Sequence, residues 1–249
     1  MTPVILTYHH VARPPGGHVS DNLFVTPEDF SWQMEFLKKE KFTVITLDQL
    51  RDDLLGRKKA PGRSVVITFD DGFYDNYQNA APVLKKYGFP AVIFMVSREI
   101  RDEGEPATFN NPEAYLSLRE LRELKNNGIE IGSHACSHRR LAEIPLEEAE
   151  REITESKSFL EKQLNCPIKW FSYPFGSFTE NLADFVRKAG YLGAVSVIRD
   201  NRQRPEQLYY LPRVMVMNDA GIFRFRYYFS RLYHVLHKRK NRRRWGKYA

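Results

Sequence analysis

The sequence has few cysteines, no long apolar run and no internal repeat, and each absence narrows the class of protein. Two cysteines, Cys136 and Cys166, lack a Cys-x-x-Cys spacing, which excludes a disulfide framework and a cysteine-rich zinc site. No run of about 18 apolar residues occurs, so no segment is expected to cross a membrane. The N-terminus lacks a basic region followed by an apolar stretch and a cleavage site, which predicts a cytoplasmic location unless a signal has been removed.

Acidic residues are absent from the C-terminal segment 220–249, which holds ten of the 38 Lys and Arg residues. The rest of the chain has 28 basic and 31 acidic residues, so the net charge of +7 comes from a basic tail on a mildly acidic body. A length of 249 residues is enough for one substantial core. We therefore expect one catalytic domain over residues 1–219 and a basic amphipathic tail over residues 220–249.

Apolar, β-branched segments alternate with helical patterns along the chain. The predicted strands are residues 4–8, 42–46, 64–69, 91–96, 129–133, 170–172, 194–198 and 211–217. The predicted helices are residues 26–40, 47–55, 74–87, 117–128, 146–164 and 181–189, and a polar loop is expected over 98–114. This alternation predicts an α/β protein with a parallel sheet, and eight strands with about six helices fit an irregular (β/α) barrel.

Two adjacent carboxylates end the most apolar strand. Residues 64–69 are apolar on both faces and are followed directly by Asp70, Asp71 and Gly72. Charges at the rim of a core need partners or a cation, and the carboxyl ends of strands are where α/β folds place their chemistry. A tight turn is the structural alternative, because Asp-Gly pairs also form turns.

Two histidines follow the strand at 129–133. His134 and His138 can converge on one ion if the segment turns like a helix. Two imidazoles and one carboxylate suit zinc, and three protein ligands with open positions are typical of a catalytic rather than a structural site. The side chain of Cys136 would have to leave the shared face of the two histidines to join them.

The motifs resemble those of a known family. Residues 68–72, His134-x-x-x-His138 and residues 173–176 are similar to the first three motifs of the polysaccharide deacetylases, the NodB-homology domains of carbohydrate esterase family 4. Two departures stand out: Ser172 occupies the position where the third motif usually carries Arg, and no late Leu-x-x-His motif is found. The opening Tyr8-His9-His10 and the segment 210–214 instead resemble a circularly permuted branch, to which deacetylases of poly-β-1,6-N-acetylglucosamine belong.

This resemblance implies a distorted seven-stranded barrel and a set of roles. Asp71, His134 and His138 would hold a divalent metal, with zinc favoured over other first-row metals, Asp70 would be the base, and His9 rather than His10 the acid. Adjacent side chains alternate on an extended strand, which also favours separate roles for the two aspartates. Arg213 would replace the missing third-motif Arg. The loop Tyr173, Pro174, Phe175, Gly176 would line a sugar groove and present a backbone N–H to the oxyanion, with a simple turn as the alternative.

The resemblance implies metal-dependent hydrolysis of the N-acetyl group of an amino sugar, in a glycan or a lipid-linked glycan. A deformylase acting on a lipid-linked amino sugar, a non-sugar amidohydrolase of the same fold and a binding protein with a degenerate site remain as alternatives. The resemblance implies no particular oligomeric state.

The tail has the pattern of an amphipathic helix. One apolar face would comprise Ile222, Phe225, Phe229, Leu232, Tyr233 and Leu236. Arg224, Arg231 and Lys238 recur on another face, and Trp245 and Tyr248 could act as interfacial anchors. The pattern predicts a helix on an anionic membrane surface, peripheral on the inner face of the membrane. The alternative is a helix packed on the barrel with only residues from about 238 onward in solvent; nucleic acid is the less favoured partner.

Overall fold

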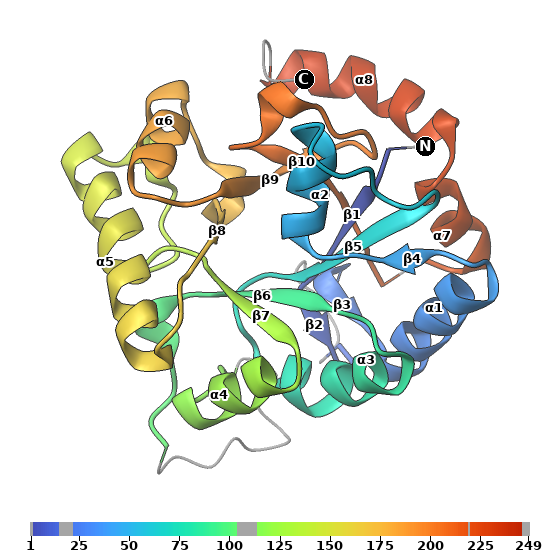
Figure 1. Ribbon diagram of the computed structural model, residues 1–249, viewed down its shortest axis with the longest axis horizontal. Coiled ribbons are helices and arrows are strands. Elements are labelled where there is room, and N and C mark those ends of the chain that lie inside the picture. Colours follow the sequence, from blue (N-terminus) through green and yellow to red (C-terminus); the bar gives the residue numbers. More distant parts are fainter. Residues whose placement is uncertain (1, 15–21, 104–113, 219, 246–249) are drawn as a thin grey trace.

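Seven parallel strands close into a barrel with helices around it (Figure 1). The computed structural model describes residues 2–14, 22–103, 114–218 and 220–245. Around the ring the order is β1-β10-β9-β8-β7-β6-β5, and β5 pairs with β1 to close it. The strands are β1 (Val4–Tyr8), β5 (Ser64–Phe69), β6 (Ala91–Met95), β7 (Ile129–Ser133), β8 (Trp170–Ser172), β9 (Gly193–Arg199) and β10 (Leu211–Met215). The predicted α/β barrel is therefore confirmed.

Three short strands lie outside the ring. β4 (Thr43–Val44) pairs with β5 and accounts for the eighth predicted strand. The pair β2 (His10–Val11) and β3 (Phe24–Val25) was not predicted. These two strands are too short to show a periodic pattern, whereas β4 lies within the longer apolar segment 42–46 that was predicted.

Apolar side chains from six of the seven ring strands form one buried cluster with α2 (Leu47–Leu54). The strand members are Ile5, Val66, Val92, Phe94, Trp170, Val195 and Leu211. The seventh strand, β7, has Gly132 beside them, where a Cβ atom would lie 2.5 Å from the Phe94 ring. The indole of Trp170 donates to Asp48 of α2 at 2.9 Å, so this helix is tied to the barrel by a polar contact as well.

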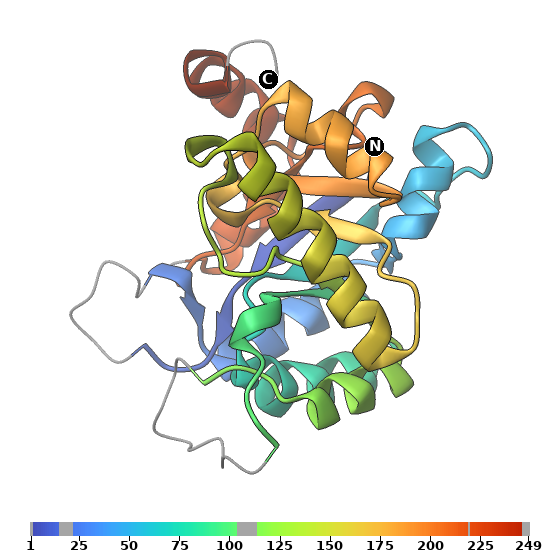
Figure 2. The same cartoon turned by 90° about the vertical axis from the view of Figure 1, so that its left-hand side faces the viewer.

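A larger cluster joins the outer surface of the barrel to the surrounding helices. These are α1 (Pro27–Lys39), α3 (Ala81–Tyr87), α4 (Leu118–Asn126), α5 (Leu146–Leu164) and α6 (Glu180–Lys188); a π-helical segment, η2 (Asn76–Ala80), precedes α3. Figure 2 shows α5 and α6 lying across one side of the barrel. Thr26 caps the start of α1, and Ser117 caps α4 in a full capping box with Glu120, so both helices begin where they were predicted. Of the predicted loop 98–114, residues 104–113 lie outside the described residues.

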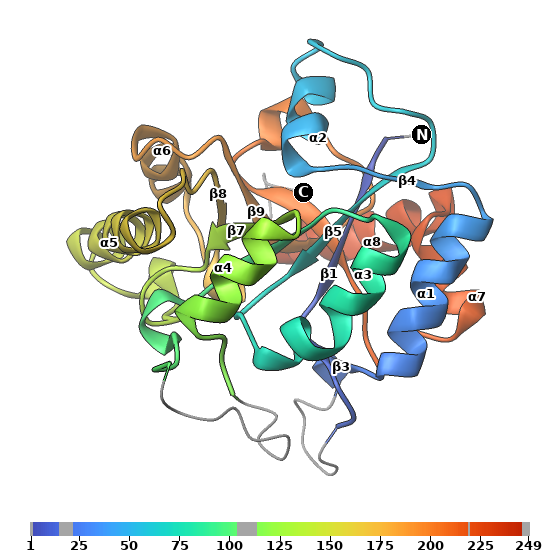
Figure 3. The same ribbon diagram turned by 60° about the horizontal axis from the view of Figure 1, so that its bottom comes forward.

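The C-terminal segment forms two helices, α7 (Ile222–Tyr228) and α8 (Arg231–Trp245). α7 lies beside α1 (Figures 1 and 3), where Phe225 packs edge-on against Trp32 and Phe36 at 5.5 Å between ring centroids. α8 is anchored by His234, whose Nδ1 donates to the carboxylate of Asp200 at 2.9 Å.

The expected single apolar face is wrong. Phe225, Phe229 and Tyr233 are buried, whereas Ile222, Leu232 and Leu236 are exposed. The break between α7 and α8 changes the helical phase, so residues that would share one continuous face point to different sides. The expected boundary at residue 219 remains a prediction, and that residue lies outside the described part. Within the described part of the chain, no helix is long and apolar enough to cross a membrane.

Candidate active site

The predicted site residues meet at the carboxyl ends of the barrel strands. Asp70 and Asp71 follow β5, His134 follows β7 and His9 follows β1. They line a cavity of about 310 Å³. Its wall comprises His9, Leu23, Asp70, Asp71, His134, His138, Arg140, Phe175, Val197, Arg199 and Met215.

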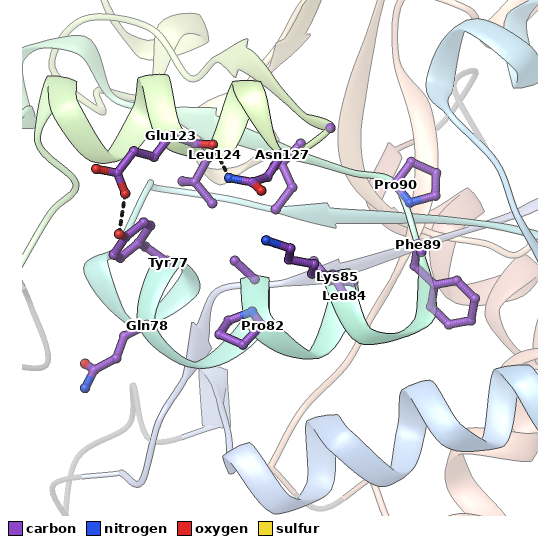
Figure 4. Close-up of a pocket in the computed structure, with 14 residues that line it drawn as sticks. Tyr77, Gln78, Pro82, Leu84, Lys85, Phe89, Pro90, Glu123, Leu124 and Asn127 are labelled. Carbon is purple, nitrogen blue, oxygen red and sulfur yellow. Dashed lines mark hydrogen bonds between the residues drawn. The ribbon is translucent and has the colours of Figure 1, made fainter.

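A larger hollow of about 720 Å³ lies elsewhere, between α3 and α4 on the outside of the barrel (Figure 4). Three of its polar residues bond to each other: the Tyr77 hydroxyl donates to the carboxylate of Glu123 at 2.5 Å, and the Asn127 amide donates to the Glu123 carbonyl at 2.7 Å. It is mainly apolar and brings no acid and imidazole together, so the smaller cavity is the candidate active site.

Asp70 and Asp71 face different partners. Asp71 has a φ of 72°, which turns the chain out of the strand conformation immediately after Asp70. Its Oδ1 lies 3.3 Å from Nε2 of His134 and 3.2 Å from Nε2 of His138. Asp70 faces Arg213. The predicted separation of the two carboxylates is therefore present in the structure.

Asp71, His134 and His138 fit a metal. One ligand atom from each lies within 4.8 Å of the other two. Nδ1 of His134 lies 2.7 Å from the carbonyl oxygen of Ser172, which can only accept, so Nδ1 carries the proton and Nε2 presents its lone pair to Asp71. Oδ1 of Asp71 is buried without a well-oriented hydrogen bond among the described residues. A buried carboxylate oxygen facing two imidazoles is a suitable zinc donor set.

The path from His134 to His138 differs from the expected helical turn. The intervening residues form a tight turn in which Ala135 has a φ of 64° and His138 a φ of 54°. The imidazole centroids are 5.1 Å apart. The thiol of Cys136 contacts the backbone carbonyl of Glu152 at 3.5 Å, and this residue takes no part in the ligand cluster.

Arg213 forms a bidentate ion pair with Asp70. Its Nη1 and Nη2 donate to the two carboxylate oxygens at 2.8 and 2.6 Å, and its Nε donates to the carbonyl of Ser196 at 2.9 Å. Burial raises the pKa of Asp70, but the Arg213 charge and hydrogen bonds outweigh burial and leave that pKa below its usual range. Ser172 accepts from Arg213 and donates to Asp70, both at 3.2 Å. The guanidinium from β10 thus lies beside the position where the family's third motif carries Arg.

His9 and His10 have different surroundings. His9 is buried against the cavity, and its Nδ1 has no hydrogen-bond partner among the residues that the structure describes. Burial is the main cause that lowers the pKa of His9, although the charges of Asp71 and Asp70 oppose it. The ring of His10 is bonded to Asp75 at 2.8 Å and stacked on Phe24 and Phe73. Of the two histidines, His9 reaches the site.

The loop at 173–176 contributes mainly one side chain. Phe175 is 44% exposed and lies 4.5 Å from the His138 ring, with the guanidinium of Arg140 4.4 Å above it. Tyr173 is buried, and its hydroxyl donates to the carbonyl of Tyr209. Pro174 and Gly176 are buried as well. Among these four predicted substrate contacts, Phe175 alone lines the cavity.

The loop's amides are partly used within the fold. The Tyr173 N–H donates to the carbonyl of Val195 at 3.3 Å and the Gly176 N–H to the carbonyl of Tyr173 at 2.8 Å.

Sequence analysis missed Arg140 and Arg199 in the cavity wall. Arg199 ends β9, so the rule that chemistry lies at strand ends could have found it.

Comparison with known proteins identifies the family. A family model for polysaccharide deacetylases matches residues 57–194, which is more than half of the chain. The Bacillus subtilis (strain 168) protein YxkH is 30% identical over 212 residues, covering 85% of this chain and 70% of the relative. The chain belongs to the polysaccharide deacetylase family.

Other deacetylases extend this similarity. The poly-β-1,6-N-acetyl-D-glucosamine N-deacetylase of Staphylococcus aureus (strain MRSA252) is 29% identical over 210 residues, covering 80% of this chain and 70% of that enzyme. The solved structure of the Streptococcus pyogenes deacetylase PplD in complex with acetate has a TM-score of 0.79 at 23% identity and covers 92% of this chain and 99% of that one. At that identity the structural likeness shows that this chain and PplD share a fold.

Proposed function

We propose that this deacetylase removes N-acetyl groups from a polymer of β-1,6-linked N-acetylglucosamine with the help of zinc. The observation that carries the proposal is that two adjacent carboxylates in one cavity have different partners. Asp71 faces the two imidazoles, and Asp70 forms an ion pair with Arg213. Similarity to the Staphylococcus aureus poly-N-acetylglucosamine deacetylase supports this choice of substrate.

Asp71, His134 and His138 would hold the metal. Zinc bound there would polarise the acetyl carbonyl and make water a stronger acid. Asp70, kept ionised by Arg213, accepts the proton of the attacking water. His9 delivers a proton to the leaving amine; burial lowers the pKa of His9, and the charges of Asp71 and Asp70 oppose that shift. Water and an acetamide thereby become acetate and a free amine.

The cavity wall is suited to a sugar. Phe175 presents a half-exposed aromatic ring next to His138, and such rings stack on the apolar faces of pyranoses. A lipid-linked glycan is the second form of substrate that we propose to test. Deformylation and non-sugar amide hydrolysis remain the alternatives.

The deciding experiment is a panel of N-acetylated amino sugars, in free, polymeric and lipid-linked form, assayed for released acetate and for released formate. We expect acetate from the β-1,6-linked polymer in wild type and none from His138→Ala. Formate from formylated sugars without acetate would assign the deformylase, and hydrolysis of non-sugar amides alone would assign the amidohydrolase. No product from any of these, with a metal bound, would favour a binding protein.

We further propose that α8 binds the anionic surface of a membrane. Tyr233, His234 and Asn241 pack on the barrel, which leaves the opposite side of the helix in solvent. That side presents Leu232, Val235 and Leu236, each 55–59% exposed, and then exposed Arg239 and Arg243 at the helical spacings. Exposed apolar side chains beside several cations and no acid fit a charged lipid surface better than a nucleic acid.

The helix also contacts a residue of the cavity wall. The Asn241 side chain donates to the backbone carbonyl of Arg199 at 2.9 Å, and Arg199 lines the cavity. A membrane contact through α8 would therefore hold the site close to a glycan made or anchored at that surface. Cytoplasmic location at the inner leaflet stays a prediction, which cell fractionation can check.

Sedimentation with vesicles tests the membrane proposal. We expect binding to vesicles containing anionic lipid at low salt, because each basic residue near such a surface contributes about 1 kcal/mol before screening. Lys238→Glu combined with Arg239→Glu and Arg243→Glu should abolish this binding, and Leu232→Ser with Leu236→Ser should weaken it. Substitutions are preferable to deletion of residues 220–249 in this test, because the deletion would also remove buried aromatic residues.

The matched control is Lys58→Glu with Lys59→Glu, which removes exposed positive charge from a loop far from α8 in the sequence. The control should bind vesicles like wild type. Equal binding by the α8 charge variant, or no binding by wild type at low salt, would contradict the proposal. Salt-dependent binding to nucleic acid without binding to lipid would assign the tail to a nucleic acid.

A further inference from the structure

A buried carboxylate faces the turn between the two histidines. Glu152 of α5 is 6% exposed, and no ion pair of this residue is found in the described part of the chain. Its Oε2 accepts from the backbone N–H groups of Cys136 and Ser137, both at 2.8 Å, and its Oε1 accepts from the Ser137 hydroxyl at 2.6 Å. A buried carboxylate without a cation must be compensated by hydrogen bonds, and this turn supplies them.

The turn itself has an uncommon backbone. Ala135 and His138 both have left-handed φ values, 64° and 54°, although neither is glycine. Such conformations persist only where the surrounding structure holds them. Successive N–H groups that point to the same side form a concave site for an anion, and Glu152 supplies that anion from a neighbouring helix.

We propose that Glu152 is a positioning residue for the metal site. It holds the turn and so sets the placement of His138 relative to His134. None of its hydrogen bonds goes to an imidazole, and His134 is oriented separately by the carbonyl of Ser172. The inference rests on the proposed function, since it takes both histidines as metal ligands.

Zinc affinity, measured by competition with a chromogenic chelator, tests this role. Partners that orient metal ligands typically change affinity by about 10- to 100-fold, so we expect Glu152→Ala to weaken zinc binding within that range. Excess zinc should restore much of its deacetylase activity, because Asp70, His9 and Arg213 remain in place. Ser137→Ala, which removes one of the three hydrogen bonds, should have a smaller effect.

Glu152→Gln keeps the shape of the side chain and one carbonyl oxygen, which can accept hydrogen bonds from both backbone N–H groups. It should bind zinc more tightly than Glu152→Ala and more weakly than wild type, and it decides the matter if the alanine variant does not fold by circular dichroism. The matched control is Glu155→Ala on the same helix, an exposed carboxylate that pairs with Arg98 at 3.6 Å. Its zinc affinity should equal that of wild type.

Two failures are distinguishable. Wild type without zinc affinity would overturn the proposed metal site itself. Zinc bound by wild type and equally well by folded Glu152→Gln and Glu152→Ala would leave the metal site intact and overturn the positioning role.

Discussion

At the scale of single residues, two neighbouring aspartates acquire different chemistry from their contacts. Asp70 meets a guanidinium that is fully buried, and Asp71 meets two imidazoles. Burial raises the pKa of either carboxyl. The charge and hydrogen bonds of Arg213 outweigh burial for Asp70, and the interactions with the nearby imidazoles of His134 and His138 outweigh it for Asp71, so both pKa values are lowered. Identical side chains one residue apart can therefore serve different steps.

Asp70→Asn should keep zinc and lose turnover. The amide cannot accept the water's proton, and removing a general base typically costs about 10²–10⁴-fold in rate. The assay pairs acetate release with metal analysis. His138→Ala is the counterpart and should lose zinc and activity together. Loss of zinc in Asp70→Asn with zinc retained in Asp71→Asn would reverse the two roles.

Arg213→Met should destabilise the protein as well as impair activity. Both partners of the Arg213–Asp70 pair are buried, so the methionine leaves an uncompensated buried charge, which typically costs about 3–5 kcal/mol. Urea unfolding measures the loss. Combining Arg213→Met with Asp70→Asn should recover part of that stability, because the double variant no longer buries the unpaired carboxylate of Asp70. Additive losses in the double variant would show that Arg213 acts by packing alone.

At the scale of elements, side chains from different strands and helices form local charge clusters. Glu130 on β7 lies near Lys169, which precedes β8, and near Asp48 on α2. Lys169 contacts Asp48 at 2.5 Å and Glu130 at 3.6 Å, so it pairs better with the aspartate. Burial and then the charge of Asp48 raise the pKa of Glu130. The cluster therefore contains one carboxylate whose ionisation opposes folding.

Glu130→Gln should raise the free energy of unfolding at pH 7. A raised pKa in the folded state means that the charged form is disfavoured there, so the cost is present above the folded pKa and absent below the unfolded value. The gain over wild type should shrink as the pH falls toward 4. Urea unfolding at the two pH values checks it. A gain that is equal at both would indicate a packing effect instead.

At the scale of the whole molecule, barrel closure and the docking of the C-terminal helices complete the core. β1 pairs with β5 on one side and β10 on the other, so the first and last ring strands are neighbours. Phe225 and Phe229 then pack on α1 and on Phe42. α7 is packed on the folded body, and the outer side of α8 is exposed to solvent.

Phe225→Ala and Phe223→Ala form a matched pair on α7. Phe225 is 0% exposed and Phe223 is 87% exposed. Truncating a buried Phe typically costs about 3–5 kcal/mol, whereas an exposed substitution changes stability by about 0.5 kcal/mol or less. Thermal and urea unfolding should separate the two variants. Similar stability in both would mean that α7 is not docked in solution.

Local sequence determined much of this architecture. Apolar, β-branched runs marked every ring strand, and Thr26 and Ser117 marked helix starts, because these signals depend on neighbours a few residues away. The motif at 68–72 and the two histidines pointed to the site for the same reason. The order of strands along the chain then favoured a parallel barrel.

Tertiary structure decided the contacts between distant segments. Arg213 and Asp70 are 143 residues apart, and only ring closure brings them together. The hydrogen bonds that Glu152 accepts from the turn between the two histidines also join separate elements. The docking of α7 and α8 decides which aromatic residues of the tail are buried. Sequence periodicity describes one element at a time, whereas the partner of a side chain depends on how all the elements pack.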